Sequence, residues 1–237
     1  MEFFDQFPTM EQQSLRDFKK GIDLAFRNFA RTYGDGIESF FEPLLMFLVW
    51  LEKLLINSPW LIIILALALL AWVASRSILL VIGTIISFLI IGYFGMWKDT
   101  MATVAIITVS TLICLTAGIP LGILMARSNR VQSAILPILD MMQTIPSFVY
   151  LIPILMLLGI GKVPGLIAVC IYAIPPIIRL TNLGIREVDK ESLEAIDSFG
   201  ATTWQRLTKV QIPLALPTIF AGVNQTIMMA LAMVVIA

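Results

Sequence analysis

Long runs of uncharged, apolar residues alternate with short charged clusters along most of this chain. Because about 20 apolar residues cross a bilayer as an α-helix, the runs predict six transmembrane helices. The expected spans are residues 58–75, 77–95, 101–126, 141–160, 163–181 and 214–236. Pro175 and Pro176 fall inside the fifth span and are expected to kink it. The pattern therefore predicts an all-α, polytopic membrane protein.

Composition agrees with this fold class and narrows the chemistry. The 237 residues are 59% hydrophobic and 14% charged, whereas about a quarter of a soluble domain is charged. The net charge is zero and there is no histidine, so nothing indicates a nucleic-acid partner, and the commonest metal ligand and general base are missing. We expect no metal site and no catalytic residue. Cys114 and Cys170 lie in apolar runs and are expected to be buried thiols.

Basic residues in short loops predict the orientation of the bundle. The region that follows the fifth span carries Arg186, Lys190, Arg206 and Lys209, which indicates a cytoplasmic location. Alternation of the spans then places residues 1–57 outside the cytoplasm. These considerations predict a multi-pass protein of the cytoplasmic membrane.

The N-terminal tail, residues 1–57, has no apolar core typical of a cleavable signal peptide. Within it, residues 37–55 are amphipathic, because Glu42, Glu52 and Lys53 interrupt the apolar positions. We expect a helix that lies in the outer membrane interface; an additional transmembrane pass is the alternative. Residues 58–237 would form the transmembrane domain, and we expect the natural protein to continue past residue 237.

One long polar stretch, residues 189–213, separates the last two spans. Acidic residues at its start favour a helix N-terminus, and apolar or small residues recur every three or four positions. These are Leu193, Ile196, Gly200, Trp204 and Leu207. The spacing predicts one short amphipathic helix or two helices hinged at Gly200. Such a segment could lie on the membrane surface or dock into another protein.

The spacing in this stretch resembles the EAA signature of ABC importer permeases. Glu194-Ala195-Ile196, Gly200 and, nine residues later, Val210-Gln211-Ile212-Pro213 fit the pattern without a gap. Ile196 stands for the usual second alanine and Val210 for the usual isoleucine. The resemblance implies that residues 189–213 form a cytoplasmic coupling loop that docks on an ATPase subunit. Small side chains at Ala195 and Gly200 would permit close approach.

A second resemblance covers most of residues 137–237. The stretches "PILDMMQTIPSFVYLIP" (137–153), "GIGKVPGLIA" (159–168), "PPIIRLTNLGIREV" (175–188) and "AGVNQTIMMALAMVVIA" (221–237) are similar to glycine betaine/proline-type permeases. This similarity implies a type I ABC importer (MetI-like) bundle that imports compatible solutes during osmotic stress. It also implies a homodimer of permease subunits, two ATPase subunits and an extracytoplasmic substrate-binding protein or fused domain.

ATP chemistry is expected to come from a partner, because the chain has no phosphate-binding G-x-x-x-x-G-K-[ST] motif. ATP and Mg²⁺ would be bound by the ATPase subunits, and we expect no cofactor on this chain. Rival hypotheses are a permease for choline or an amino acid, a proton-coupled carrier and a membrane scaffold. A carrier would need a relay of titratable groups, for which Asp140 is the only acid near the later spans.

Several residues inside the apolar segments are candidates for function. Asp140 and Arg179 are a candidate ion pair, since charged residues inside a membrane are costly and usually paired. Gly118 and Gly122 form a G-x-x-x-G pair suited to close helix packing. The candidate path and hinge positions are helix-breaking prolines, aromatic residues and two amides: Pro146, Phe148, Tyr150, Pro175, Pro176, Asn224 and Gln225. Ordinary packing is the alternative for the prolines.

Overall fold

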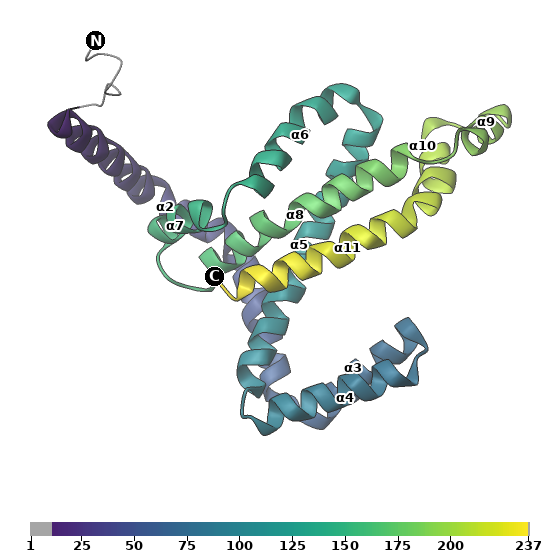
Figure 1. Ribbon diagram of the computed structural model, residues 1–237, viewed down its shortest axis with the longest axis horizontal. Helices are drawn as coiled ribbons and strands as arrows, with labels where there is room; N and C mark the ends of the chain where they lie inside the picture. Colours follow the sequence, from purple (N-terminus) through teal and green to yellow (C-terminus); the bar gives the residue numbers. More distant parts are fainter. Residues whose placement is uncertain (1–10, 237) are drawn as a thin grey trace, which may run out of the picture.

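A computed structural model describes residues 11–236, and every regular element in this range is a helix (Figure 1). This confirms the predicted all-α class. The helices, in chain order, are α2 (Gln12–Asn57), α3 (Trp60–Ser75), α4 (Ile78–Tyr93), α5 (Trp97–Arg127), α6 (Asn129–Thr144), α7 (Phe148–Leu158), α8 (Lys162–Arg186), α9 (Lys190–Ser198), α10 (Thr203–Arg206), the π-helical η1 (Leu207–Gln211) and α11 (Ile212–Val234).

Three of the expected spans are single helices that are long and apolar enough to cross a membrane. They are α5, α8 and the continuous stretch Thr203–Val234, which joins α10, η1 and α11. Two bent pairs, Ser39–Asn57 with α3 and α6 with α7, also satisfy the test when each is taken as one span. The helices α3 and α4 correspond to the first two expected spans but have only 16 residues each.

The core is a three-helix contact in which α8 lies between α5 and α11 (Figure 1). Glycine permits this close approach at both interfaces. A Cβ added to Gly122 of α5 would lie 2.6 Å from the Thr181 Cβ of α8 and 2.8 Å from the Ile178 carbonyl oxygen. On the other side, a Cβ at Gly184 would lie 2.9 Å from the Thr218 Cβ of α11. Close packing at the G-x-x-x-G pair is therefore confirmed.

The fourth expected span, residues 141–160, is not one helix. Helix α6 already begins at Asn129, where the Ser128 hydroxyl accepts a hydrogen bond from the Val131 amide at 3.4 Å. It ends before Pro146, and α7 follows at an angle of 91°. Ile145 has an extended backbone (ψ 129°), because the proline ring disfavours a helical conformation in the preceding residue. The break expected at the helix-breaking Pro146 is therefore present, and the fourth span is a bent pair of helices.

The double proline of the fifth span does not end its helix. Pro175 and Pro176 are both buried inside α8, which continues to Arg186. Proline removes a backbone donor, but packing against the neighbouring helices on both sides holds the segment in place. The thiols Cys114 and Cys170 are free and lie across the α5–α8 contact, with the Cys114 Sγ 3.5 Å from the Cys170 carbonyl oxygen.

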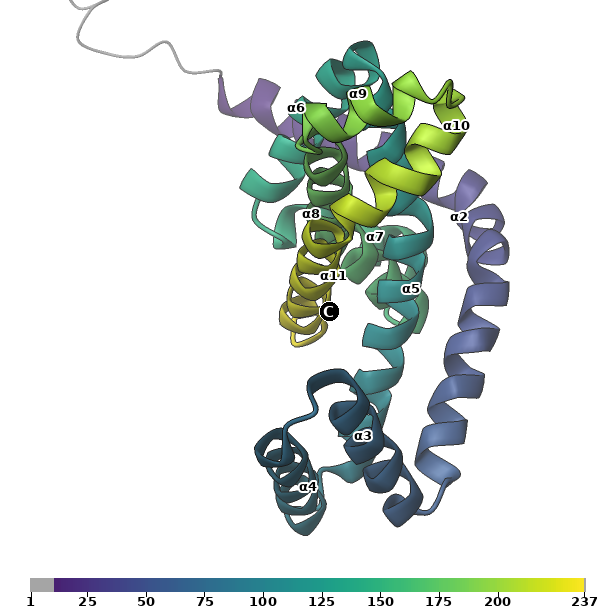
Figure 2. The same ribbon diagram turned by 90° about the vertical axis from the view of Figure 1, so that its right-hand side faces the viewer.

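Helix α2 has 46 residues, and its second half packs along α5 (Figure 2). Leu48 is fully buried against Ala105 and Val109 of α5. Glu52 forms an ion pair with Lys162 at the start of α8. The amphipathic segment is thus held against the bundle by its apolar face and by a charge. The extracytoplasmic location of residues 1–57 stays a prediction.

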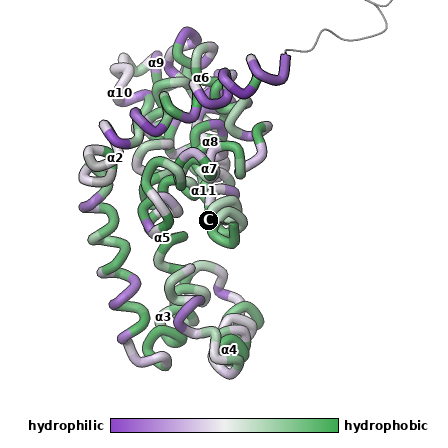
Figure 3. Tube along the Cα trace, turned by 90° about the vertical axis from the view of Figure 1, so that its left-hand side faces the viewer, coloured by the Kyte–Doolittle hydropathy of each residue, from purple (hydrophilic) through white to green (hydrophobic). Residues whose placement is uncertain are grey.

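The hairpin of α3 and α4 has the most apolar surface of the chain. Helix α4 has no buried residue, and α3 buries only Ile63, Ile64 and Ala68. Figure 3 shows that hydrophilic residues gather instead on the first half of α2 and around α9. An all-round apolar hairpin of this kind is stable where lipid or another transmembrane helix covers it.

The glycine contact between α5 and α8 generates a stability prediction. In Gly122→Ala, the added methyl group would force α5 and α8 apart, and we expect a loss of about 1–3 kcal/mol. The midpoint of thermal unfolding of the purified protein in detergent measures this. Gly83→Ala in α4 is the matched control, because a Cβ there meets nothing within 4 Å. Equal midpoints for the two variants would contradict the packing argument.

Candidate functional site

The polar stretch folds into two short helices joined by a turn. Asp189 caps α9, since its carboxylate accepts a hydrogen bond from the Ser192 amide at 3.1 Å. After the turn, Thr202 and Gln205 form a reciprocal capping box that starts α10. The chain then continues through η1 into α11. The sequence allowed one helix or two, and the structure has two. We call residues 189–213 the coupling loop.

Gly200 makes the turn between α9 and α10. Its φ of +72° lies in the left-handed region, where a side chain is disfavoured by roughly 1–2 kcal/mol. A Cβ at this position would meet no atom within 4 Å. Within this chain, Gly200 is therefore required for backbone conformation and not for close packing. The glycine of the EAA pattern is therefore explained by the left-handed backbone conformation of this turn.

An ion pair braces the turn from the side. The Arg206 Nη1 lies 2.8 Å from the Asp197 Oδ2, which ties α10 to the end of α9. Both side chains are partly exposed, so the pair contributes at most about 1 kcal/mol, but it fixes the angle between the two helices. The sequence analysis missed this pair, because a separation of nine residues has no periodic signature when a turn intervenes.

The coupling loop divides into inward and outward side chains. Leu193 and Ile196 are half-buried and Leu207 is buried, as the expected apolar stripe requires. Trp204, expected on the same stripe, is instead 66% exposed, and its neighbour in the turn, Phe199, is 88% exposed. The turn at Gly200 reorients α10, so a single helical stripe does not continue across it.

The exposed tip of the loop carries the residues of the EAA resemblance. Glu194 and Ala195 lie on the exposed surface of α9, close in sequence to Phe199. The Glu194 carboxylate provides charge on this surface, and the Ala195 methyl group and the exposed Phe199 ring provide apolar area. Large exposed aromatic side chains are typical of residues that anchor protein–protein contacts.

The base of the loop rests on the ends of the core helices. A polar pocket of about 360 Å³ lies between them, lined by Ala126 and Arg127 of α5, Ile185 of α8, and Asp197, Ala201, Thr203, Arg206 and Gln211. Basic residues that were expected on the cytoplasmic side, such as Arg127 and Arg206, therefore meet at one end of the bundle. The Arg186 guanidinium also joins α8 to α5 by a 2.8 Å hydrogen bond to the Met125 carbonyl.

The end of the motif leads directly into α11. Val210 and Ile212 are half-buried, and Pro213 is the second residue of α11, directly after the π-helical turn. Helices α10, η1 and α11 form one continuous stretch from Thr203 to Val234. The second half of the loop, from Thr203 on, is thus joined to a core helix without a flexible linker.

The candidate ion pair of Asp140 in α6 and Arg179 in α8 is present in the structure. Pro146 lies in the break between α6 and α7, and Phe148 at the start of α7 is 55% exposed. Tyr150 is half-buried, and its hydroxyl has no hydrogen-bond partner among residues 11–236. These residues gather where α6, α7 and α8 meet.

The remaining candidates do not join this group. Asn224 and Gln225 are exposed on α11, while their neighbours Gly222 and Thr226 are buried in the contact with the other core helices. The two amides therefore face away from the core of this chain. Within the described range, no three acidic, cysteine or histidine side chains come together as a metal site would require.

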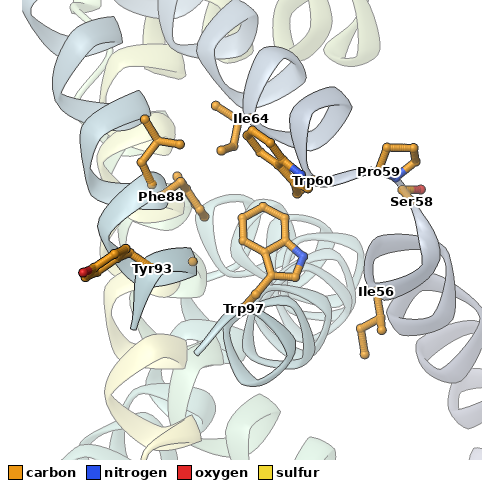
Figure 4. A pocket seen from close by; sticks show the side chains of 10 residues that line it. Ile56, Ser58, Pro59, Trp60, Ile64, Phe88, Tyr93 and Trp97 are labelled. Carbon is orange, nitrogen blue, oxygen red and sulfur yellow. The ribbon is translucent and has the colours of Figure 1, made fainter. Parts of the chain in front are cut away.

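A second cavity, of about 570 Å³, lies at the opposite end of the bundle from the coupling loop, where α3 and α5 begin and α4 ends (Figure 4). Trp60 and Trp97 project into it, while Tyr93 points away. The lining is mostly apolar and contains no charged side chain. The sequence analysis did not single it out, although Trp and Tyr at the ends of apolar runs are typical of membrane interfaces.

Comparison with known proteins agrees with this geometry. Residues 118–237 match the family model described as binding-protein-dependent transport system inner membrane component. This region includes the C-terminal third of α5, the α6–α7 break, α8, the coupling loop and α11.

Similar proteins are transport permeases by name. The glycine betaine/proline betaine transport system permease protein ProW of Escherichia coli is 47% identical over 218 residues, which are 92% of this chain and 60% of ProW. The glycine betaine/carnitine transport permease protein GbuB of Listeria monocytogenes is 51% identical over 181 residues, 76% of this chain and 64% of that protein.

A third relative matches nearly the whole chain. The glycine betaine transport system permease protein OpuAB of Bacillus subtilis is 42% identical over 234 residues, 98% of this chain and 80% of OpuAB. This chain spans less than two thirds of ProW and GbuB. From these matches and the helical fold, the chain belongs to the family of binding-protein-dependent transport system inner membrane components.

Proposed function

We propose that this chain is the permease subunit of an ATP-driven importer for glycine betaine, proline betaine or related zwitterions. The observation that carries the proposal is the coupling loop: a rigid, capped turn with an exposed tip and a base fixed to the core helices. The names of ProW, GbuB and OpuAB support the class of substrate. Import of choline or an amino acid by the same machinery is the alternative.

The loop geometry supports a route for force. An ATPase subunit that binds Glu194, Ala195 and Phe199 would displace the tip of the coupling loop. The displacement passes to α11 through the continuous helix from Thr203, and to α5 and α8 through the polar pocket at the base. The bundle would then rock between outward- and inward-open states.

The assembly in this proposal contains two copies of the chain, two ATPase subunits that bind ATP and Mg²⁺, and an extracytoplasmic binding protein or domain. Each copy would present one coupling loop to one ATPase. A proton-coupled carrier or a scaffold fits less well, because the family is one of binding-protein-dependent transport components and the described range offers no relay of titratable groups.

The docking role of the loop tip is tested by Phe199→Ala and Glu194→Lys. We expect each to weaken binding of the ATPase subunit at least about tenfold, since an aromatic or charged anchor at an interface is worth about 2 kcal/mol or more. Co-purification and a titration of the ATPase against the permease in detergent give the Kd.

The control for this experiment is Phe94→Ala, which removes an aromatic ring that is 71% exposed near the opposite end of the bundle. It should leave the Kd for the ATPase unchanged. If Phe199→Ala and Glu194→Lys also bind the ATPase with the parent affinity, the tip does not form the docking surface.

Import itself is tested with the natural full-length protein, its ATPase and its binding protein in lipid vesicles. We expect uptake of labelled glycine betaine when ATP is present on the side of the membrane that carries the ATPase. A non-hydrolysable ATP analogue should support no uptake, because transport is driven by closure of the ATPase pair. Proline betaine should compete with the label. Uptake that is inhibited by choline or proline but not by proline betaine would favour the alternative substrates.

A further inference from the structure

The ion pair between α6 and α8 has an unusual setting for two charges. Between Lys162 and Arg186 at its ends, Arg179 is the only charged residue of α8, and Asp140 is the only acid of α6 and α7. Charged groups inside apolar segments are costly, are usually paired and often mark the route of a polar solute. The pair is therefore the strongest candidate for a polar function within the bundle.

The pair lies in the half of α8 nearer the coupling loop. Arg179 precedes Arg186 by seven residues, which corresponds to about 10 Å along a helix. Arg186 in turn contacts Met125 at the end of α5, beside the base of the loop. A solute that moves through the bundle toward the coupling loop would meet this pair late in its passage.

Neither charge is fully satisfied by the other. Arg179 donates through one terminal nitrogen to Asp140, and its Nε is buried without a hydrogen-bond partner in the described range. A guanidinium has five donors and can bind a carboxylate through two of them. The Asp140 side chain is 61% exposed, against 31% for Arg179. The arrangement leaves unused donors on Arg179 and an open side on Asp140.

Both helices are weakened beside the pair. Helix α6 ends four residues after Asp140, at the 91° break before α7. In α8, Pro175 and Pro176 come four and three residues before Arg179 and remove two backbone donors from the helix. Local separation of α6 from α8 is easier at such positions than in an unbroken helix.

Aromatic side chains lie on the approach to the pair. Tyr172 is seven residues before Arg179 and thus lies two turns away on nearly the same face of α8. Tyr150 of α7 packs in the same core cluster as Tyr172. Aromatic rings attract quaternary ammonium groups through their π faces. The guanidinium and the carboxylate match the two ends of a betaine, and the Tyr172 phenol lies about two helical turns before Arg179 along α8.

We propose that Asp140 and Arg179 form a transient site for zwitterions, in which the solute carboxylate binds Arg179 while the solute ammonium group faces Asp140. The inference rests on the proposed function and specifies its path. Insertion of a zwitterion keeps the four charges alternating, so the ion pair can open without leaving a bare charge in an apolar region. When the pair closes again, it competes with the solute and releases it.

The test neutralises both charges at once. Asp140→Asn with Arg179→Gln keeps two amide groups that can hydrogen-bond across the helices but cannot bind a zwitterion by charge. In the complete complex in vesicles, we expect glycine betaine uptake per ATP hydrolysed to fall at least about tenfold, the effect of losing hydrogen bonds to charged groups. The midpoint of thermal unfolding and the ATPase rate should stay close to those of the parent.

Two further variants complete the design. The reversed pair, Asp140→Arg with Arg179→Asp, exchanges the positions of the two charges. A zwitterion can bind it in the opposite orientation, so this variant should recover most of the uptake. Glu52→Gln with Lys162→Gln neutralises a second long-range ion pair, which joins α2 to α8, and should leave uptake per ATP unchanged. This control shows what the loss of a purely structural brace does.

Two results would overturn the inference. In the first, the neutral pair transports glycine betaine with the parent ratio of uptake to ATP. In the second, uptake and thermal stability fall together, as they would for a structural brace. Absence of glycine betaine uptake by the unmodified complex is a separate result, which counts against the proposed function itself.

Discussion

The close contact of α8 with α5 and α11 is the constraint on which the rest of the bundle depends. In an apolar medium, helices gain little from hiding hydrophobic surface and associate through tight packing instead. Gly122 and Gly184 allow that packing on the two sides of α8. Because the backbones approach closely there, α5, α8 and α11 form one tightly packed unit.

The coupling loop takes its rigidity from this unit. Its caps, its left-handed glycine and its ion pair fix the shape of the turn, while Leu207 and the polar pocket fix its base. None of these contributions is large alone. Together they hold the tip of the loop in a defined position relative to the core helices.

Sequence patterns predicted the apolar helices and the glycine packing and left one helix or two open for the coupling loop, because each depends on local spacing or conformation. Helix ends were less predictable: Pro146 was noted, yet residues 141–160 were expected to form one span, since hydropathy does not register backbone geometry. The exposure of Phe199 and Trp204 and the Asp197–Arg206 pair depend on how the turn orients two helices. The aromatic cavity joins two stretches, residues 56–64 and 88–97, which only the hairpin of α3 and α4 brings together, so no periodicity could reveal it.

The π-helical segment η1 has a consequence for how the two ends of the long helix communicate. A π turn contains one residue more than the α-helical turns that flank it, so the side chains of α10 and α11 are offset by a fraction of a turn. Loss or migration of that extra residue would rotate α11 about its own axis without changing its tilt. Between Arg206 and Ile212 the chain therefore contains a position at which a shift of the π turn by one residue would rotate α11 relative to α10.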